Sequence, residues 1–365
     1  MRWTATGSLA WQQVVGATEA QARSAFSSLS DASIHASAAG VLSEQSHFLR
    51  DAVLDRLRQD LPFGPAADPE SVSTYGAAAP GTLPTKKAPD AAAPLGPVYA
   101  VWAQGLGGWG SLGGNGNVAR TDDSIGGVIS GLDVTFNRMA RLGFAGGYTR
   151  SNFNSVGIPA SGGADSYHFA LYGGWQDGPW ALRGGGAFTW NNLDTSRQVT
   201  AVNLGGAQDG SYADKTWQAF VEGARSFAFG PGAALEPFAN VAYVHVGGDV
   251  GESGLAAMSG STSFDTTYTT LGVHGSYVLP AGLSAQATLG WRYAFDVTPL
   301  SNLAFQPGGS AFALAGTPIA RNALVTELGL NYAIGPSATL GIAYSGQSAG
   351  GANENSGKAT FTVRF

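Results

Sequence analysis

Most of the chain, from residue 98 to residue 365, alternates between apolar positions and polar or small ones with a period of two. In the segment 283–295 every second residue, from Leu283 to Phe295, is apolar, whereas the intervening residues are Ser, Gln, Thr, Gly, Arg and Ala. This pattern is typical of β-strands with one apolar face. It predicts twelve strands, at about 98–110, 121–136, 139–153, 163–176, 179–192, 212–229, 233–246, 264–279, 282–295, 321–335, 337–347 and 356–365.

Every second connection between these strands is a tight turn. Asn137-Arg138 and Asp177-Gly178 contain two residues each, whereas the connections that follow them contain roughly nine and nineteen residues, rich in Gly, Ser, Asn and Asp. An even number of strands, with short turns at one end and long loops at the other, is typical of bacterial outer-membrane barrels.

The aromatic residues help to separate this interpretation from a soluble β-sandwich or an up-and-down barrel in water. A soluble barrel would carry Lys and Glu outside, but the polar faces here are small and rich in Gly. Aromatic residues gather near strand ends, as in the girdle of a membrane barrel. The expected girdle residues are Trp102, Trp109, Tyr148, Trp175, Trp180, Trp190, Tyr243, Tyr277, Trp291, Tyr332 and Tyr344.

Residues 17–60 contain no Pro and predict a helix, for which Asp31 is a candidate N-cap. Its main part, 31–59, would span about 43 Å at 1.5 Å per residue, enough to cross a bilayer, although its surface is too polar to face lipid. It therefore either passes through a polar channel or docks on a soluble core. The candidate pore-helix residues are His35, Leu42, Leu49, Arg50, Val53, Arg56 and Leu57.

The helix is flanked by two segments of different character. Residues 61–97 hold 8 of the 17 Pro residues with Ala, Gly and Thr, which predicts a linker. Residues 1–16 lack the apolar core of a signal peptide, and no stretch reaches the roughly 18 apolar residues of a spanning helix. If the protein is exported, we expect it to begin upstream of Met1, with residues 1–16 as the junction to a preceding domain.

Composition excludes several classes of function. The net charge of −6 and the 12% of charged residues leave no basic stripe for nucleic acid. With no Cys, the chain has no disulfides, thiolate metal sites or cysteine nucleophiles.

The distribution of glycine indicates how the interior of the barrel is filled. Of the 54 Gly residues, 47 lie within 98–365. Lipid cannot satisfy backbone polar groups, so a spanning sheet must close, and twelve strands leave a narrow lumen. Gly and Ala on inner faces would make room there for the helix. The predicted fold is an all-β membrane protein, a twelve-stranded antiparallel transmembrane β-barrel (98–365) with an N-terminal α-helix inside the pore.

Strand parity places polar groups on the inner wall, where opposite charges are expected to pair with one another or with the helix. Arg225 falls on the lipid face, so either its side chain reaches the membrane surface or the register of its strand slips. The candidate lumen-facing residues are Arg183, Gln218, Glu222, Gln286, Arg292, Glu327 and Arg364.

Two sequence motifs known from enzymes occur without the neighbouring residues or elements that each of them requires. Gly346-Gln347-Ser348-Ala349-Gly350 spells G-x-S-x-G, but no His or Asp follows it. The segment 105–110 spells G-x-G-x-x-G, but no helix follows to bind a phosphate. The five His residues lack the spacing of metal ligands. We therefore predict no enzymatic activity, no catalytic or metal-binding residue and no cofactor.

Several short segments of the sequence carry a family resemblance. They are 25–30, 34–37 and 48–57 in the helix, and 101–105, 172–174, 235–239, 270–273, 289–292, 344–347 and the terminal Phe365 in the barrel. Together they resemble the C-terminal translocator domain of a type V autotransporter, over about 17–365. The resemblance implies a monomer in the bacterial outer membrane, with a passenger domain upstream that is displayed or released outside the cell. It also implies outer-membrane lipid, periplasmic chaperones and the β-barrel assembly machinery as partners.

The last strand ends on Phe365, with Val363, Phe361 and Ala359 at every second position before it. This pattern is similar to the C-terminal signal that the assembly machinery reads, and a free strand edge can pair with such a partner by strand addition. Some members of the family release their passenger by a cleavage inside the pore that uses an Asn of the helix. Residues 1–60 contain no Asn, so we expect the passenger to stay attached or to be cut by another protease.

The sequence therefore predicts an outer-membrane translocator that passes or anchors an upstream passenger at the cell surface. The alternatives are a stand-alone porin or adhesin barrel, and an outer-membrane esterase or protease with its active site in the loops. The passenger itself is not predicted, because one translocator fold serves toxins, proteases, adhesins and lipases alike.

Overall fold

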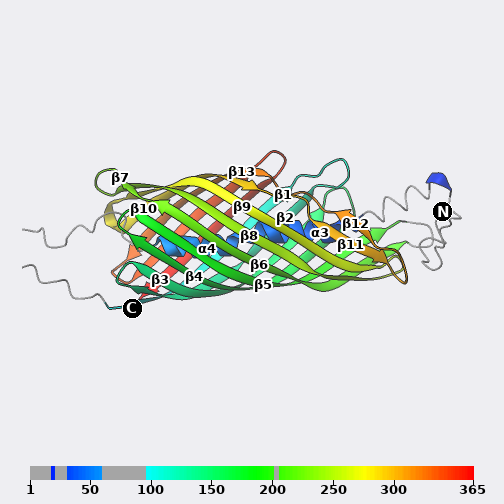
Figure 1. Cartoon of the computed structure of the whole chain (residues 1–365), viewed down its shortest axis with the longest axis horizontal. Helices are drawn as coiled ribbons and strands as arrows, with labels where there is room; N and C mark the ends of the chain where they lie inside the picture. The colour runs from blue at the N-terminus through cyan, green and yellow to red at the C-terminus, as the bar shows by residue number, and fades with distance from the viewer. Residues whose placement is uncertain (1–17, 21–30, 60–95, 201–204) are drawn as a thin grey trace, which may run out of the picture.

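The computed structural model describes residues 18–20, 31–59, 96–200 and 205–365, and its strands form one closed antiparallel sheet. Strand β1 (Val98–Leu112) pairs with the last strand, β15 (Asn353–Arg364), which closes the ring (Figure 1). The other strands of the ring are β2 (Thr121–Phe136), β3 (Ala140–Ser155), β4 (Ala160–Asp177), β5 (Trp180–Val199), β6 (Gly206–Arg225), β8 (Ala233–Ser253), β9 (Met258–Val278), β10 (Leu283–Ala294), β13 (Asn322–Ile334) and β14 (Ala338–Ser348). The predicted twelve-stranded barrel is confirmed.

The tight turns lie at one mouth of the barrel, at the left in Figure 1, where the C-terminus also lies. Asn137 and Arg138 have φ angles of 50° and 56°, the left-handed conformation that both central residues of a type I′ hairpin adopt. Ala281, in the short 3₁₀ turn Pro280–Gly282 between β9 and β10, has a φ of 62°. The short connections predicted from the sequence are therefore hairpin turns.

At the opposite mouth, four strands run further than predicted, namely β5, β6, β8 and β9. The predictions that β5 and β8 end at residues 192 and 246 are wrong, because they continue to Val199 and Ser253. In these extensions the apolar side chains switch to the inner face, and Leu193 and Val250 are buried. The outward alternation that marks a lipid-facing strand therefore stops where the lipid stops, although the strand continues.

The predicted long loop between β10 and β13 also contains sheet. Strands β11 (Leu300–Phe305) and β12 (Phe312–Ala315) form a hairpin, and β11 pairs with the extension of β9 from Met258 to Ser263. A further two-residue strand, β7 (Phe227–Ala228), pairs with β8 at the other mouth. These short strands bring the total of the sheet to fifteen without changing the twelve-stranded ring.

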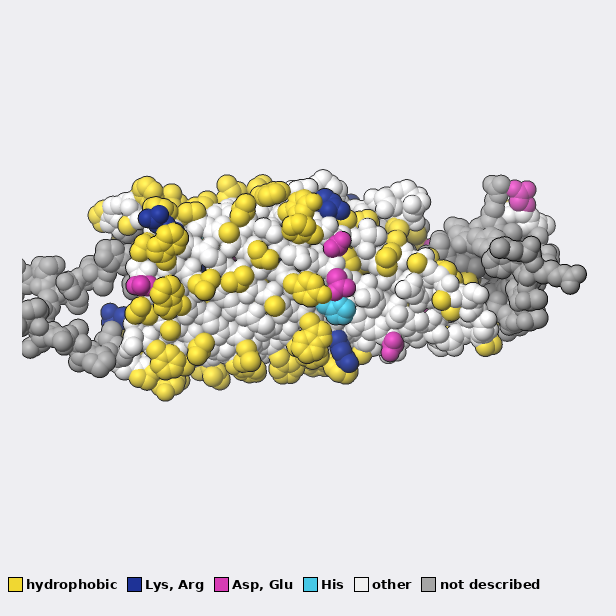
Figure 2. Space-filling view, in the orientation of Figure 1, with side chains coloured by type: hydrophobic (Ala, Val, Ile, Leu, Met, Phe, Trp, Pro, Cys, Tyr) yellow, Lys and Arg dark blue, Asp and Glu magenta, His cyan; other side chains and the backbone are white. Residues whose placement is uncertain are grey.

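The outer wall of the barrel is apolar. Leu171, Leu328 and Ile342 expose 68%, 66% and 58% of their surface, and Figure 2 shows large hydrophobic side chains gathered in two bands along the near face. Such a surface is stable against lipid rather than water. None of the described helices is both long enough and apolar enough to cross a membrane.

The expected aromatic girdle residues point outward, with one exception. Trp102 is only 1% exposed, and its indole Nε1 donates a hydrogen bond to the Tyr172 hydroxyl over 2.7 Å inside the barrel. Its place in the girdle was therefore predicted wrongly. The ring lies over Gly131, where an added Cβ would come within 2.7 Å of it, so a glycine on the next strand makes room for this aromatic side chain.

A helix in two segments, α3 (Ser33–Gln45) and α4 (His47–Arg58), runs along the inside of the barrel (Figure 1). The predicted cap at Asp31 is wrong, because Ala32 is the N-cap and no side chain caps it. Ser46 separates the segments, where its Oγ donates to the Ser43 carbonyl over 2.7 Å in competition with the helical backbone bonds. The expected junction 1–16 and most of the linker 61–97 lie outside the described residues.

Some of the glycines make room for this helix. A Cβ at Gly174 would lie 3.1 Å from Leu57 of α4, and one at Gly108 would lie 3.2 Å from Phe48. A Cβ at Gly316, in the segment after β12, would come within 2.4 Å of the α3 backbone. Others, such as Gly131 and Gly143, accommodate aromatic rings of the barrel wall instead.

The closing pair of strands provides a test of the fold. Gly357 of β15 lies opposite Gly107 of β1 and Tyr344 of β14. Its N–H faces β1, because Phe365, eight residues further along the same strand, exchanges both backbone bonds with Tyr99 of β1. We expect Gly357→Pro to remove a ladder donor at the closure and to cost about 3 kcal/mol, so that the unheated protein no longer migrates faster than the boiled protein on a gel. Gly357→Ala is the control that keeps the backbone donor and the fast band, since an added Cβ has no atom within 4 Å. A fast band from the proline variant would contradict the closure.

Candidate functional site: the helix-filled pore

The helix contacts the wall through ionic groups at three levels, the first near the mouth with the long strands. His35 Nε2 lies 2.8 Å from Glu252 of β8, and its Nδ1 lies 2.8 Å from the Tyr212 hydroxyl of β6. Arg197 of β5 holds Glu252 with two further bonds of 2.7 and 2.8 Å. Just before α3, burial raises the pKa of Asp31 to about 6, against the opposing effect of the Arg197 charge.

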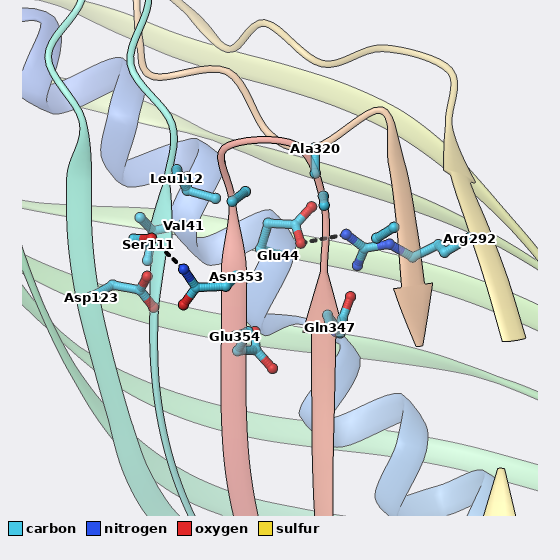
Figure 3. A pocket seen from close by; sticks show the side chains of 13 residues that line it. Val41, Glu44, Ser111, Leu112, Asp123, Arg292, Ala320, Gln347, Asn353 and Glu354 are labelled. Carbon is cyan, nitrogen blue, oxygen red and sulfur yellow. Dashed lines mark hydrogen bonds and ion pairs between the residues drawn. The ribbon is translucent and has the colours of Figure 1, made fainter. Parts of the chain in front are cut away.

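At the middle level every residue of the helix from Val41 to Gln45 is buried against the wall. Arg292 of β10 donates to Glu44 over 2.6 Å, and Gln45 donates to Asp123 of β2 over 2.9 Å. Figure 3 shows Glu44 and Arg292 directed toward each other beside a cavity of about 20 Å³. A space of this size holds about one water molecule.

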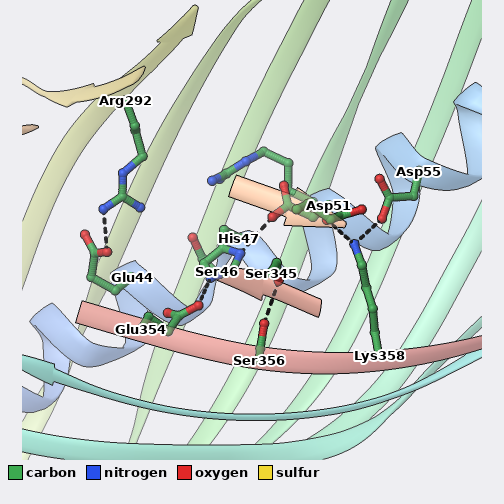
Figure 4. Close-up of polar contacts among 12 residues, drawn as sticks. Glu44, Ser46, His47, Asp51, Asp55, Arg292, Ser345, Glu354, Ser356 and Lys358 are labelled. Carbon is green, nitrogen blue, oxygen red and sulfur yellow. Dashed lines mark hydrogen bonds and ion pairs between the residues drawn. The ribbon is translucent and has the colours of Figure 1, made fainter. Parts of the chain in front are cut away.

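His47 also lies at this level, between two carboxylates. Its Nδ1 is 2.8 Å from Asp51 on the same helix, and its Nε2 is 2.8 Å from Glu354 of β15 (Figure 4). An ionised carboxylate can only accept hydrogen bonds, so both ring nitrogens must donate. The geometry therefore fits a positively charged imidazolium that links the helix to the last strand.

A second charged link to β15 lies about two turns further along the helix, at Asp55. Lys358 Nζ is 2.5 Å from Asp55 of α4 and 2.7 Å from Glu327 of β13, as the dashed line to Asp55 in Figure 4 indicates. The three side chains are largely shielded from water, with exposed fractions between 12% and 22%. One lysine thus links a carboxylate on the helix to one on the wall, and Asp55 also accepts a bond from Arg58 over 2.8 Å.

At the third level, nearest the mouth with the tight turns, arginines dominate. Arg58 donates to Glu222 over 2.7 Å, and Arg183 joins Glu222 to Glu236 over 3.1 and 2.7 Å. On the other side of the helix, Arg56 makes two bonds to Asp133, of 2.6 and 2.9 Å.

The helix also ends at this level. Arg141 of β3 donates to the carbonyl groups of Arg56 and Gln59 over 2.5 and 2.8 Å. A cation at the C-terminal carbonyls satisfies backbone acceptors that have no partner within the helix.

The apolar stripe of the helix faces the wall between these levels. Leu42, Leu49, Val53 and Leu57 are all buried within the main hydrophobic core of the barrel. Arg50 donates to Gln218 over 3.3 Å, and Gln218 in turn donates to the Ser46 carbonyl over 3.1 Å. The side-chain bond to Ser46 reinforces the interruption between α3 and α4.

The structure brings most of the sequence-predicted residues to the helix. Arg183, Gln218, Glu222, Arg292 and Glu327 belong to the contacts above. Gln286 has the parity of Arg292 but is exposed, and it takes no part in these contacts. Arg364 lines a cavity of about 860 Å³ at the mouth with the tight turns, together with Arg56, Arg138 and Arg141.

The sequence analysis missed several contributing residues. They are Glu44, His47, Asp55 and Arg58 on the helix, and Asp133, Arg141, Glu236, Glu252, Glu354 and Lys358 on the wall. The strand parity that selected Arg364 applies equally to Lys358, so the wall residues could have been found. Which helix residue each one meets depends on the rotation of the helix, which no sequence pattern specifies.

One cluster in the pore has the composition of a metal site. Glu222, Glu236 and His274 offer ligand atoms within 4.8 Å of one another. Arg183 contacts both glutamates and Arg58 contacts Glu222, so two guanidinium groups already balance the two carboxylates. We interpret the cluster as an ion-pair network, because a divalent cation would face these positive charges at close range.

A closed barrel with an apolar outer wall and a charged helix through its pore defines an integral outer-membrane protein of the translocator class. The chain belongs to the autotransporter β-domain family, whose model matches residues 101–345. It is an outer-membrane translocator for a passenger domain, and the family membership confirms the predicted location and function.

Solved structures support the same fold. The translocator domain of the autotransporter NalP from Neisseria meningitidis aligns with a TM-score of 0.63 at 18% identity, over 90% of this chain and 98% of that one. The transport unit of the autotransporter AIDA-I from Escherichia coli gives 0.53 at 17% identity, over 73% of this chain and 90% of that one.

Curated relatives extend beyond this chain. An extracellular serine protease of Serratia marcescens is 31% identical over 91% of the chain. The match spans only 30% of that relative's own length. The family assignment therefore holds for this chain, whereas the name "serine protease" refers to the whole Serratia protein.

The Lys358 link provides a test of the helix contacts. We expect Lys358→Met to leave Glu327 without a cation beside Asp55, which keeps only its bond from Arg58. The variant should destabilise the folded protein by about 3 kcal/mol, seen as a lower midpoint of heat-induced unfolding. The triple variant Lys358→Met, Asp55→Asn, Glu327→Gln removes the uncompensated charges and should recover most of the loss. An unchanged midpoint for the single variant would show that this link contributes nothing.

Proposed function

We propose that the chain anchors and exports a passenger that precedes it in the polypeptide, and that α3–α4 stays in the pore afterwards as a plug. The observation that carries this proposal is the fit of the helix, which is joined to the wall at three levels and has nearly all of its residues buried inside the barrel. A helix packed in this way blocks ions and water.

The direction of the helix supports export. Its N-terminal segment α3 lies toward the mouth with the long strands, and its C-terminal segment lies toward the mouth with the tight turns (Figure 1). Short turns are periplasmic in outer-membrane barrels. Chain upstream of α3 would thus leave the barrel at the outer surface, where a passenger is displayed.

We propose that the barrel itself performs no chemistry. Ser348 of the G-x-S-x-G sequence is the last residue of β14, and no helix follows it as a nucleophile elbow requires. Any activity of the whole protein would then belong to the passenger. The name of the Serratia relatives makes a secreted protease one candidate, but the translocator does not select among passengers.

We propose that assembly depends on the final strand before the barrel closes. In the closed barrel Phe365 exchanges two backbone hydrogen bonds with Tyr99, of 2.9 and 3.0 Å, so the edge of β15 is occupied. Pairing with the assembly machinery by strand addition would therefore precede the pairing of β15 with β1. Periplasmic chaperones would cover the apolar outer faces until then, and full closure fits a monomer.

Channel recording tests the plug. We expect the full chain to show low single-channel conductance in planar bilayers and a variant without residues 1–97 to show a severalfold higher one, because the deletion empties the lumen. A stand-alone porin would conduct strongly in both forms, and that result would contradict the plug. The heat-induced gel shift of the deletion variant serves as the control for a folded barrel.

The role of Phe365 in assembly can be separated from a role in stability. We expect Phe365→Ser to reduce insertion into the outer membrane of cells while the purified variant refolds in detergent with a midpoint close to wild type, since the residue is 74% exposed. Phe365→Tyr keeps an aromatic end and should insert normally. Equal insertion of the serine variant and wild type would argue for a girdle residue only.

A further inference from the structure

The outer wall contains a break near the mouth with the tight turns. Strand β6 ends at Arg225, and pairing with β8 resumes two residues later at Phe227 of β7. Pro237 of β8 faces the gap and has no backbone N–H to donate. The Ser226 amide donates to the Pro179 carbonyl over 2.7 Å, which continues the pairing with the β5 side, and its hydroxyl donates to Glu236 over 2.8 Å.

The register does not slip at this break. Ala224 is opposite Phe238 before it and Phe227 is opposite Leu235 after it, which is the same register. Arg225 therefore remains on the outer face, as strand parity predicts, and the alternative of a shifted strand is wrong. Its guanidinium carbon lies 4.9 Å from the ring centres of both Trp180 and Phe227.

A groove beside this break faces the lipid, with a volume of about 800 Å³. Its floor lies at Gly223 and Ala239, a directly opposed pair of small outward-facing residues. Behind it, on the inner face of the sheet, Ala181, Ala224 and Phe238 form a small buried cluster. Its walls are exposed apolar side chains, among them Trp175, Leu182 and Pro237. A groove of this kind accepts an acyl chain in place of the flat contact that lipid makes with an unbroken wall.

Two opposite charges lie at the rim of the groove. Asp177 of β4 is opposite Trp180 of β5, and Trp180 is opposite Arg225 of β6, so the two charges are two strands apart, about 10 Å at the usual spacing. Figure 2 shows a basic and an acidic side chain among large hydrophobic ones at this end of the near face. Within the described part of the chain, the guanidinium of Arg225 forms no ion pair.

Arg225 stacks on aromatic rings through its flat face, which leaves the N–H groups at its edge free to donate. A phosphate accepts such donors two at a time, and an ammonium group complements Asp177. The tryptophans place both charges at the level of lipid headgroups. We propose that this groove binds one zwitterionic phospholipid of the periplasmic leaflet, with its phosphate on Arg225, its amine at Asp177 and an acyl chain along the groove.

The test is native mass spectrometry of the full chain released from detergent in the presence of phosphatidylethanolamine or phosphatidylglycerol. We expect one phosphatidylethanolamine to be retained about tenfold more tightly than phosphatidylglycerol, the effect of one additional ion pair of about 1.4 kcal/mol. Arg225→Gln should weaken both lipids by about tenfold, and Asp177→Asn should abolish the preference.

Two further variants complete the design. Gly223→Leu adds a side chain inside the groove, where an added Cβ has no atom within 4 Å, so it should block the acyl chain without disturbing the fold. Lys215→Gln removes a cation that lies 5.3 Å from the Trp190 ring and outside the groove, and it should bind lipid like wild type. The absence of a retained lipid, or equal retention by wild type, Arg225→Gln and Gly223→Leu, would overturn the proposal.

Discussion

A hydrocarbon solvent offers no partner for a peptide N–H or C=O group, and this constraint governs the whole structure. It requires β1 to pair with β15, because any unpaired edge inside the membrane would leave a row of unsatisfied donors and acceptors. Closure in turn creates a lumen. The lumen is then filled by a polar helix that could not face lipid, so the charges on the wall and the charges on the helix find one another away from the membrane.

The ionic contacts between helix and wall are distributed rather than concentrated. Pairs occur near His35, near Glu44 and near Arg58, at both ends and in the middle of the helix. Each buried pair is strongly unfavourable to break by removing one partner, but its net contribution to stability is modest once desolvation is counted. Together the pairs fix one position of the helix in the pore, since a shift by one helical turn or a rotation of the helix would leave several charges unmatched.

Much of this architecture can be predicted from the sequence, because the lipid imposes a simple rule on it. Residues between the two girdles alternate apolar and small or polar, and the tight turns at Asn137 and Asp177 mark every second strand end. The rule fails where the solvent changes. Beyond Trp190, residues such as Leu193 and Val199 face inward, so the strand ends cannot be located from outward alternation. The contacts of the helix depend on its rotation, and Trp102 was misplaced because a glycine on the neighbouring strand leaves room for it inside.

The reversal of the apolar face in the long strands has a consequence for the depth at which the barrel lies in the membrane. Above the girdle, β5 and β8 have the inside-apolar pattern of a protein in water, and below it the outside-apolar pattern of a protein in lipid. Bilayer thickness is therefore matched to the height at which this polarity reverses and not to the length of the strands. The rim can gain or lose residues without any change in hydrophobic matching, so the extracellular part is free to diverge while the depth of the anchor stays constant.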